Sequence, residues 1–193
     1  MTTWWWVRHG PTHATEMIGW TDLPADLSDV AALNRLRAYL PREGLLLSSD
    51  LTRAAATAQM LQGRHHRPPP DPSLREIHFG EWEGRRWDEA AESHAALSEA
   101  FWTTPGDIAA PGGESWNTLR ARVDAAVDRV SAAHPGRDIV AVAHFGVILT
   151  QLQRALGVTA HEVMAQRIEP LSVTRLALDA DGGWSPGEVN HRP

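Results

Sequence analysis

Three short apolar runs constrain the fold of this chain more than any other feature of its sequence. They are Trp4-Trp5-Trp6-Val7, Leu45-Leu46-Leu47 and Ile139-Val140-Ala141-Val142-Ala143. A strand with one face in water alternates polar and apolar residues, whereas a continuous apolar run is typical of a strand buried on both faces. Helical patterns separate the three runs, so we expect a parallel sheet that is covered by helices on both faces.

The spacing of the remaining apolar residues predicts the other elements. Helices are expected over about 29–40 and 51–61, from Trp116 to Pro135-Gly136, and from about residue 146 onward. Two strand-like segments flank Gly182-Gly183 and predict a hairpin at one edge of the sheet. The expected fold class is therefore α/β, a doubly wound and mostly parallel sheet, with one domain over 1–193. Residues 80–113 carry no strand signal, and we expect them to form a lid-like helical and loop insertion over the active site.

The composition excludes several kinds of chemistry. The chain has no Cys, which removes thiol nucleophiles and disulfides, and all 18 of its basic residues are Arg, which removes lysine chemistry. A formal net charge of −6 and scattered arginines argue against a nucleic-acid partner, which needs clustered cations. Because neither a signal peptide nor a long apolar run is visible, we expect a cytoplasmic protein with no membrane partner. The Ala-rich, Lys-free composition indicates a bacterial source.

Polar residues follow each of the three buried strands. Arg8-His9-Gly10 follows the first strand, Ser48-Ser49-Asp50 and then Arg53 follow the second, and His144 follows the third. Ligands of such sheets bind beyond the carboxyl ends of the strands, so we expect these side chains to face one crevice. Arginines and helix N-termini both favour anions, and the crevice is therefore predicted to bind one.

The available residue types limit what this crevice can do to a phosphate. In the absence of thiols and lysines, the candidate nucleophiles are histidines and hydroxyls. A neutral imidazole can accept a phosphoryl group on nitrogen while guanidinium groups stabilise the charge on its oxygens. A carboxylic acid with a pKa raised toward neutrality can protonate the leaving alkoxide and later activate water. Glu76 is the candidate for this role, and no metal or other cofactor is expected.

Five motifs in order along the chain resemble the histidine phosphatase superfamily, which is the phosphoglycerate mutase-like family. They are Arg8-His9-Gly10, Ser48-Ser49-Asp50-Leu51-Thr52-Arg53-Ala54, the segment from Leu74 to Gly84, Pro111-Gly112-Gly113-Glu114-Ser115 and Ala143-His144-Phe145-Gly146. The resemblance spans nearly the whole chain. It implies that His9 is phosphorylated, that Arg8, Arg53 and His144 bind the phosphoryl group, and that Glu76 is the proton donor.

Several positions depart from the pattern of the mutases in that family. Ile18-Gly19 stands in place of a threonine-glycine pair, Phe79 in place of a tyrosine, Thr15 in place of an asparagine and Phe145 in place of a glycine. A lysine that the mutases use is absent. These departures favour the phosphatase branch, and therefore hydrolysis, with Thr15, Gly19 and Phe145 predicted to contact the phosphate or the substrate.

Three alternatives remain open at this point. One is phosphoglycerate mutase-type phosphoryl transfer, and another is a non-catalytic module that binds a phosphate ligand. The third is a zinc hydrolase built from His9, His13, His78 and His144, although no helical ligand spacing supports it.

The sequence also predicts the kind of partner. We expect a small phosphorylated metabolite, while its identity and the oligomeric state are not specified by the residues. Trp82, Trp87, Phe101 and Trp102 lie in or near the predicted insertion and suggest an aromatic entrance. Such an entrance would suit a leaving group that contains a ring, as in a nucleoside-like phosphate.

Overall fold

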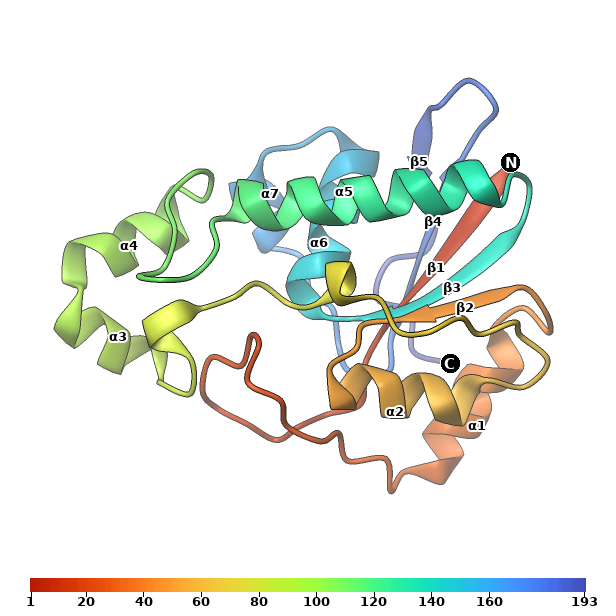
Figure 1. Ribbon diagram of the computed structural model, residues 1–193, viewed down its shortest axis with the longest axis horizontal. Coiled ribbons are helices and arrows are strands. Elements are labelled where there is room, and N and C mark those ends of the chain that lie inside the picture. The colour runs from red at the N-terminus through yellow and green to blue at the C-terminus, as the bar shows by residue number, and fades with distance from the viewer.

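The computed structural model describes residues 1–193 and has a five-stranded sheet at its centre (Figure 1). The strands follow the order β2 (Leu45–Ser48), β3 (Asp138–Ala143), β1 (Thr2–Arg8), β4 (Val173–Leu178) and β5 (Trp184–Pro186). β3 pairs in parallel with β2 and β1, whereas β4 pairs antiparallel with β1 and β5. Only β4 opposes the common direction, which confirms the mostly parallel sheet with a C-terminal hairpin at its edge.

Helices cover both faces of the sheet, as the continuous apolar strands predict. α1 (Val30–Tyr39) and α2 (Thr52–Leu61) share one core with alternate residues of β3, among them Val140 and Val142. α5 (Trp116–Ala133) and α6 (Phe145–Leu156) cover the other face, where Ile139 and Ala141 point. Alternate residues of each apolar run therefore pack into the cores on the two faces of the sheet, which is why the run contains no polar residue.

The tryptophans of β1 divide between these two cores. Trp4 and Trp6 are fully buried on the α5 and α6 face, where their rings stack with centroids 5.1 Å apart. The indole N–H of Trp4 donates to the hydroxyl of Ser131 in α5 over 3.0 Å. Trp5 packs on the other face against Tyr39 of α1. The three tryptophans are structural and anchor β1 in the centre of the sheet.

The two helices on the α1 and α2 face begin in different ways. Asp29 caps α1 by accepting from the amide of Ala32 over 2.9 Å. Leu51 is the N-cap of α2 and makes no side-chain cap hydrogen bond, while the distant carboxylate of Asp22 accepts from the amide of Thr52 over 2.7 Å. Asp50 is instead paired with Arg75 over 2.6 Å, so an ion pair to a distant segment takes the carboxylate that could have capped α2.

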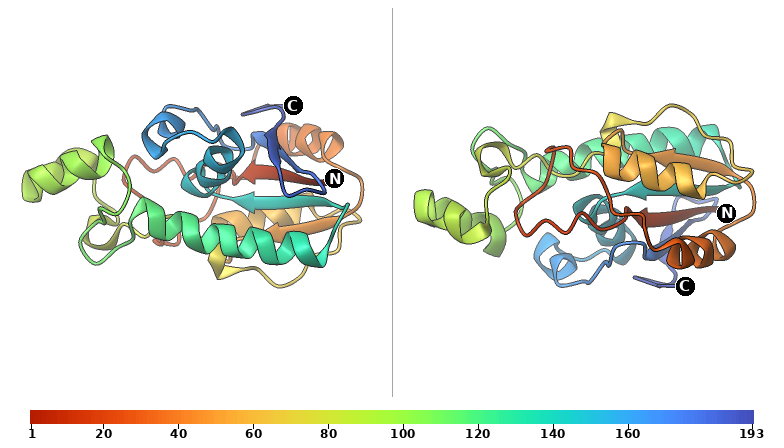
Figure 2. Two further views of the ribbon diagram at one scale, coloured as in Figure 1. Left: turned by 90° about the horizontal axis from the view of Figure 1, so that it is seen from above. Right: turned by 90° about the horizontal axis from the view of Figure 1, so that it is seen from below.

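Residues 80–113 form helices and loops without a strand. They contain the single 3-10 turn η2 (Gly80–Trp82) and the helices α3 (Trp87–Ser93) and α4 (Ala95–Thr103). Figures 1 and 2 show α3 and α4 projecting past the end of the sheet at which β1 and β3 finish. A further turn, η1 (Pro72–Leu74), and the short helix α7 (Ala160–Met164) complete the chain. None of the helices combines the length and apolarity needed to cross a bilayer.

Candidate active site

A cavity of about 250 Å³ opens beyond the carboxyl ends of β1 and β3. Its walls come from four segments that are far apart in the sequence, and the lining residues are Arg8, His9, Thr12, Ala14, Glu16, Ile18, Arg53, Glu76, Phe79 and Phe145. Five of the residues predicted from the sequence are therefore brought together here. A sixth, His144, lies just behind the cavity wall, with its ring centroid 5.0 Å from that of His9.

The hydrogen bonds of His9 define which nitrogen is free to react. Its Nδ1 lies 2.6 Å from the carbonyl oxygen of Gly10. A carbonyl can only accept, so Nδ1 carries the proton and Nε2 keeps its lone pair. The guanidinium Nε of Arg53 donates toward this Nε2 over 3.3 Å. The ring nitrogen of His9 that keeps its lone pair is thus held next to a fixed cation.

Burial and the neighbouring cations keep both imidazoles neutral. Desolvation lowers the pKa of His9 to about 3, although its hydrogen bond to Gly10 acts in the opposite direction, and Arg53 and Arg8 lower it further. Burial also holds the pKa of His144 well below its ordinary value of 6.5, with His9 and Arg53 adding to the effect. Both rings are therefore neutral at neutral pH, with one protonated nitrogen and one lone pair each, the state in which an imidazole can act as a nucleophile.

His144 has two buried ring nitrogens with no hydrogen-bond partner. The side chain is fully buried, and it lies between β3 and the first turn of α6. Buried polar atoms are nearly always paired, so an unpaired imidazole beside a cavity indicates a site whose ligand supplies the missing partner. A phosphoryl oxygen has the right chemistry to do so.

The two arginines, one buried and one half-buried, have no carboxylate paired to them. Arg53 is 1% exposed and donates to the carbonyls of Gly19 and Thr21 over 2.6 and 2.9 Å. Arg8 donates to the carbonyl of Ile168 over 2.6 Å, and its buried Nε has no partner. Burial lowers the pKa of both arginines, yet a guanidinium stays charged at physiological pH. Two guanidinium groups that lack an ion-pair partner at one cavity favour the binding of an anion there.

Glu76 reaches the same cavity from the stretch that follows η1. Its carboxylate accepts from the amide of Gly146 over 3.0 Å and from the amide of Ile77 over 2.9 Å. Gly146 lies in the first turn of α6, so the carboxylate sits at a helix N-terminus. A β-carbon at Gly146 would lie only 2.4 Å from Oε1 of Glu76, which explains the glycine at this position.

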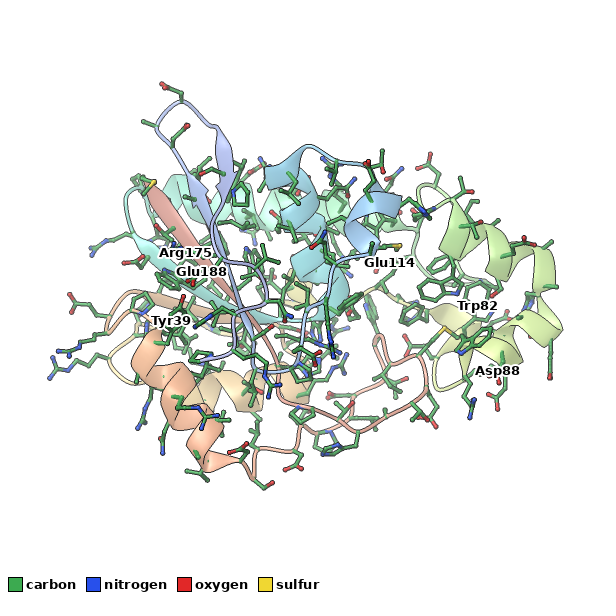
Figure 3. The ribbon with its side chains drawn as sticks, turned by 180° about the vertical axis from the view of Figure 1, so that it is seen from behind. Tyr39, Trp82, Asp88, Glu114, Arg175 and Glu188 are labelled. Carbon is green, nitrogen blue, oxygen red and sulfur yellow. The ribbon has the colours of Figure 1, made fainter.

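The backbone around Glu76 is fixed from outside the cavity. Its carbonyl accepts from the indole N–H of Trp20 over 2.8 Å and from Arg122 over 2.9 Å. Arg122 of α5 is also paired with Glu114 over 2.8 Å. Figure 3 shows Glu114 between the sheet and the projecting α3 and α4 segment. Arg122, held by this ion pair, therefore joins the start of α5 to the loop that carries Glu76 through its hydrogen bonds to the loop carbonyls.

Glu83 organises the loop that holds Arg53, a role that was not predicted from the sequence. In the sequence it stands out only as a glutamate close to Glu76, the predicted proton donor. Its carboxylate accepts from the backbone N–H groups of residues 19–21 over 3.1, 2.7 and 3.0 Å, and from the amide of Phe79 over 3.0 Å. Residues 19–21 are also the ones whose carbonyls hold Arg53. Glu83 thus positions Arg53 through the loop, without lining the cavity itself. No local motif distinguishes this role from that of an exposed glutamate.

Two of the predicted substrate contacts do not line the cavity. Thr15 is exposed, and its hydroxyl donates to the carboxylate of Glu16 over 3.3 Å, so Glu16 faces the cavity in its place. Gly19 lies behind Arg53, with its carbonyl on Arg53 and its N–H on Glu83. A β-carbon at Gly19 would lie 2.1 Å from the carbonyl oxygen of Ile77, so the glycine allows a close approach of two backbones.

The four aromatic residues predicted at the entrance do not line the cavity, and this prediction is wrong. Trp82 and Phe101 are buried with ring centroids 5.4 Å apart, and Figure 3 shows Trp82 inside the projecting segment. Trp87 and Trp102 line a separate, mostly apolar hollow of about 550 Å³ between α3 and α4. Both of these tryptophans are exposed to solvent, so only Trp82 and Phe101 contribute to the core. The aromatic lining of the cavity is instead Phe79 and Phe145.

The predicted alternative of a zinc hydrolase has no matching cluster of ligands. His13 is exposed and paired with Asp26 over 2.8 Å, and His78 packs against Trp20 with centroids 4.6 Å apart. No group of three or more His, Asp or Glu side chains is placed to hold a metal ion.

Sequence comparison agrees with this geometry. A model of the histidine phosphatase superfamily (branch 1) matches residues 4–190. The chain belongs to this superfamily.

Curated relatives of this histidine phosphatase include enzymes named as phosphatases. One is the metal-independent phosphoserine phosphatase of Arabidopsis thaliana, 33% identical over 154 residues, which are 74% of this chain and 63% of the relative. The match thus spans less than two thirds of that relative. Another is the adenosylcobalamin/alpha-ribazole phosphatase of Salmonella typhimurium, 31% identical over 177 residues, which are 86% of this chain and 85% of the relative.

Solved structures of similar proteins share the whole fold. Bacillus stearothermophilus YhfR superimposes with a TM-score of 0.87 at 26% identity, covering 98% of this chain and 97% of its own. The mycobacterial glucosyl-3-phosphoglycerate phosphatase superimposes with a TM-score of 0.80 at 27% identity, covering 99% of both chains. The phosphatases among these relatives support phosphatase activity for this member of the superfamily.

Proposed function

We propose that this histidine phosphatase is a metal-independent phosphomonoesterase that hydrolyses a small phosphorylated metabolite through a phosphohistidine at His9. One observation carries the proposal. The neutral Nε2 of His9 lies beside the guanidinium of Arg53, in a cavity that also holds Arg8 and adjoins the unpaired ring of His144. A nucleophile and groups able to bind an anion thus meet at one point.

In the first half of the reaction, Nε2 of His9 attacks phosphorus and the bond to the leaving oxygen breaks. Arg8 and Arg53 stabilise the charge on the phosphoryl oxygens, and the Arg53 N–H that faces Nε2 turns to one of these oxygens as the nitrogen forms its new bond. Glu76 donates the proton that the leaving alkoxide needs.

In the second half, a water molecule attacks the phosphorus of phosphohistidine. Glu76, now ionised, takes a proton from this water, the N–P bond breaks, and phosphate leaves with His9 neutral again. The carboxylate is suited to both proton transfers, since two backbone amides hold it at the cavity. Residues 80–113, which project past the cavity end of the sheet, are proposed to act as the lid of a single domain over 1–193.

Hydrolysis is favoured over mutase-type transfer by the charges in the cavity. Returning the phosphoryl group to an acid product requires cations that retain that product, and Arg8 and Arg53 are the only cationic side chains that line the cavity. Both are engaged with the phosphoryl group in the proposed mechanism. A bound acid would then have no cation of its own.

The test is to trap the intermediate with a radiolabelled phosphomonoester and an alkaline quench, in which phosphohistidine survives. The wild type should carry the radiolabel. His9→Ala should carry none and should not hydrolyse p-nitrophenyl phosphate. Glu76→Gln should hydrolyse p-nitrophenyl phosphate slowly. A chelator should leave the rate unchanged. Full activity of His9→Ala, or activity lost to a chelator and restored by a metal, would overturn the proposal. Phosphate binding without any turnover would instead support the non-catalytic module.

A further inference from the structure

The charged side chains that line the cavity are two arginines and two glutamates. The arginines and the buried Glu76 are all assigned to the phosphoryl chemistry. Glu16 has no part in that chemistry. It is exposed, whereas Glu76 is 7% exposed, so Glu16 lies at the mouth of the cavity, where the leaving group of a bound phosphomonoester must extend.

Local hydrogen bonds hold Glu16 in place and ionised. Its carboxylate accepts from the amide of Thr15 over 3.0 Å and from the Thr15 hydroxyl over 3.3 Å. The backbone N–H groups of Glu16 itself and of Thr15 are the main reason that its pKa lies below the ordinary value. Arg86 is the cation that influences it, but Arg86 is paired with Asp88 over 3.2 Å and does not line the cavity.

Most of the uncharged lining of the cavity is apolar. It includes Ile18, Phe79 and Phe145, and the ring of Phe145 is already covered by Arg8, 5.5 Å from its centroid. The ring of Phe79 has no such cation over it and offers an aromatic face to a ligand. A leaving group at the mouth therefore meets one negative charge and an aromatic surface, with no free positive charge.

Building on the proposed phosphatase activity, we propose that Glu16 is a specificity-determining residue that selects phosphomonoesters of amino alcohols. An ammonium group on the leaving alcohol would pair with Glu16 and contact Phe79. A carboxylate on the leaving alcohol would lie next to Glu16 without a cation to compensate it, an arrangement of like charges that is strongly unfavourable. The mouth thus discriminates by the charge of the leaving group.

The experiment compares kcat/KM for phosphoethanolamine and 3-phosphoglycerate, with p-nitrophenyl phosphate as a reference without such a charge. The wild type should prefer phosphoethanolamine. Glu16→Gln, which can still accept from Thr15, should reduce the preference about tenfold, and Glu16→Arg should reverse it. High salt should reduce the preference in the wild type, because a charge at the surface is screened. Glu43→Gln, an equal change of charge at the opposite end of the sheet, should leave all three rates unchanged.

The outcomes separate this inference from the proposed function. Absence of p-nitrophenyl phosphate hydrolysis and of phosphohistidine in the wild type would overturn the proposed function, and the inference with it. Hydrolysis through His9 with a preference for 3-phosphoglycerate would overturn the inference alone. The inference would also be overturned if Glu16→Gln kept the wild-type ratio of kcat/KM for phosphoethanolamine to that for 3-phosphoglycerate. The same holds if Glu43→Gln changed this ratio as much as Glu16→Gln does. If Glu16→Arg does not fold, as judged by its thermal unfolding, Glu16→Gln decides.

Discussion

The guanidinium of Arg53 holds Nε2 of His9 and a loop of the backbone at the same time. Its Nε donates to Nε2 of His9 over 3.3 Å, while its two terminal nitrogens donate to the carbonyls of Gly19 and Thr21 over 2.6 and 2.9 Å. The planar group fixes these directions relative to one another. The orientation of the cation toward the phosphoryl site is therefore coupled to the loop that Glu83 anchors.

Arg53→Lys should abolish most of the activity although the charge is kept. A lysine ammonium cannot donate in three fixed directions, so neither the loop nor the phosphoryl contact is maintained. We expect kcat/KM for p-nitrophenyl phosphate to fall by about 100-fold or more, as for the loss of a transition-state donor. Arg42→Lys, in the exposed loop before β2, is the matched control and should have no effect. Activity of Arg53→Lys within threefold of wild type would contradict this role.

Gly146→Ala should impair catalysis by displacing Glu76. The new β-carbon would meet Oε1 of Glu76 at 2.4 Å, and the carboxylate would have to leave the amide of residue 146. We expect kcat to fall by about 10- to 100-fold, in the range of one general acid, with a smaller effect on the inhibition constant of phosphate. Gly106→Ala is the control, because its β-carbon would have only a contact at 3.9 Å. Equal kcat values for both variants would rule out the positioning of Glu76 by residue 146.

The His9 ring should remain neutral far into the acidic range. Burial lowers its pKa to about 3, so the ring nitrogens should keep their neutral-state NMR shifts down to about pH 4, in contrast to an exposed histidine. Spectra of the ¹⁵N-histidine-labelled protein, assigned with His9→Asn, provide the measurement. A midpoint near 6.5 for the His9 signals would show that the imidazole is solvated and not held as described.

The same shift affects stability with a definite sign. The folded state has the lower pKa, so between pH 6.5 and about 3 the unfolded chain binds more protons at His9 than the folded protein does. The contribution of this group to stability is therefore complete above pH 6.5 and decreases as the pH falls through this range.

Glu83→Gln should destabilise the protein at neutral pH. Burial alone would raise the pKa of Glu83, but hydrogen bonds from Thr21, Trp20 and Phe79 outweigh it and lower the pKa below its ordinary 4.5. A glutamine places an N–H group among backbone donors, and leaving these unpaired should cost about 1–3 kcal/mol in the free energy of unfolding. Denaturant unfolding measures this cost, with the exposed Glu81→Gln as control.

The pH dependence of Glu83 gives a second check of the same anchor. Since its folded pKa is depressed, its stabilisation is fully present above about pH 4.5 and is lost as the pH falls through the folded value. The wild type should therefore lose stability in acid more steeply than Glu83→Gln does. Parallel curves for the two proteins below pH 4.5 would mean that the ionised carboxylate does not anchor the loop.

Much of the fold and part of the site could be predicted from the sequence alone. The apolar runs ending at Arg8 and before His144 identify central strands, because burial on both faces removes every polar position from such a strand. Parallel strands end at the same edge, so the positions of His9, Arg53 and His144 near one cavity follow from local patterns together with a general rule of topology.

What only the tertiary structure decided depends on contacts between distant segments. Glu16 rather than Thr15 faces the cavity, and Glu83 anchors residues 19–21, because the loops around them take shapes set by hydrogen bonds between segments far apart in the chain. Of the aromatic residues in 80–113, Trp82 and Phe101 are buried in the core, whereas Trp87 and Trp102 stay exposed on α3 and α4, away from the cavity. A local pattern specifies which side chains are apolar or charged, but the direction in which each points is decided by the packing of elements that are not neighbours in the chain.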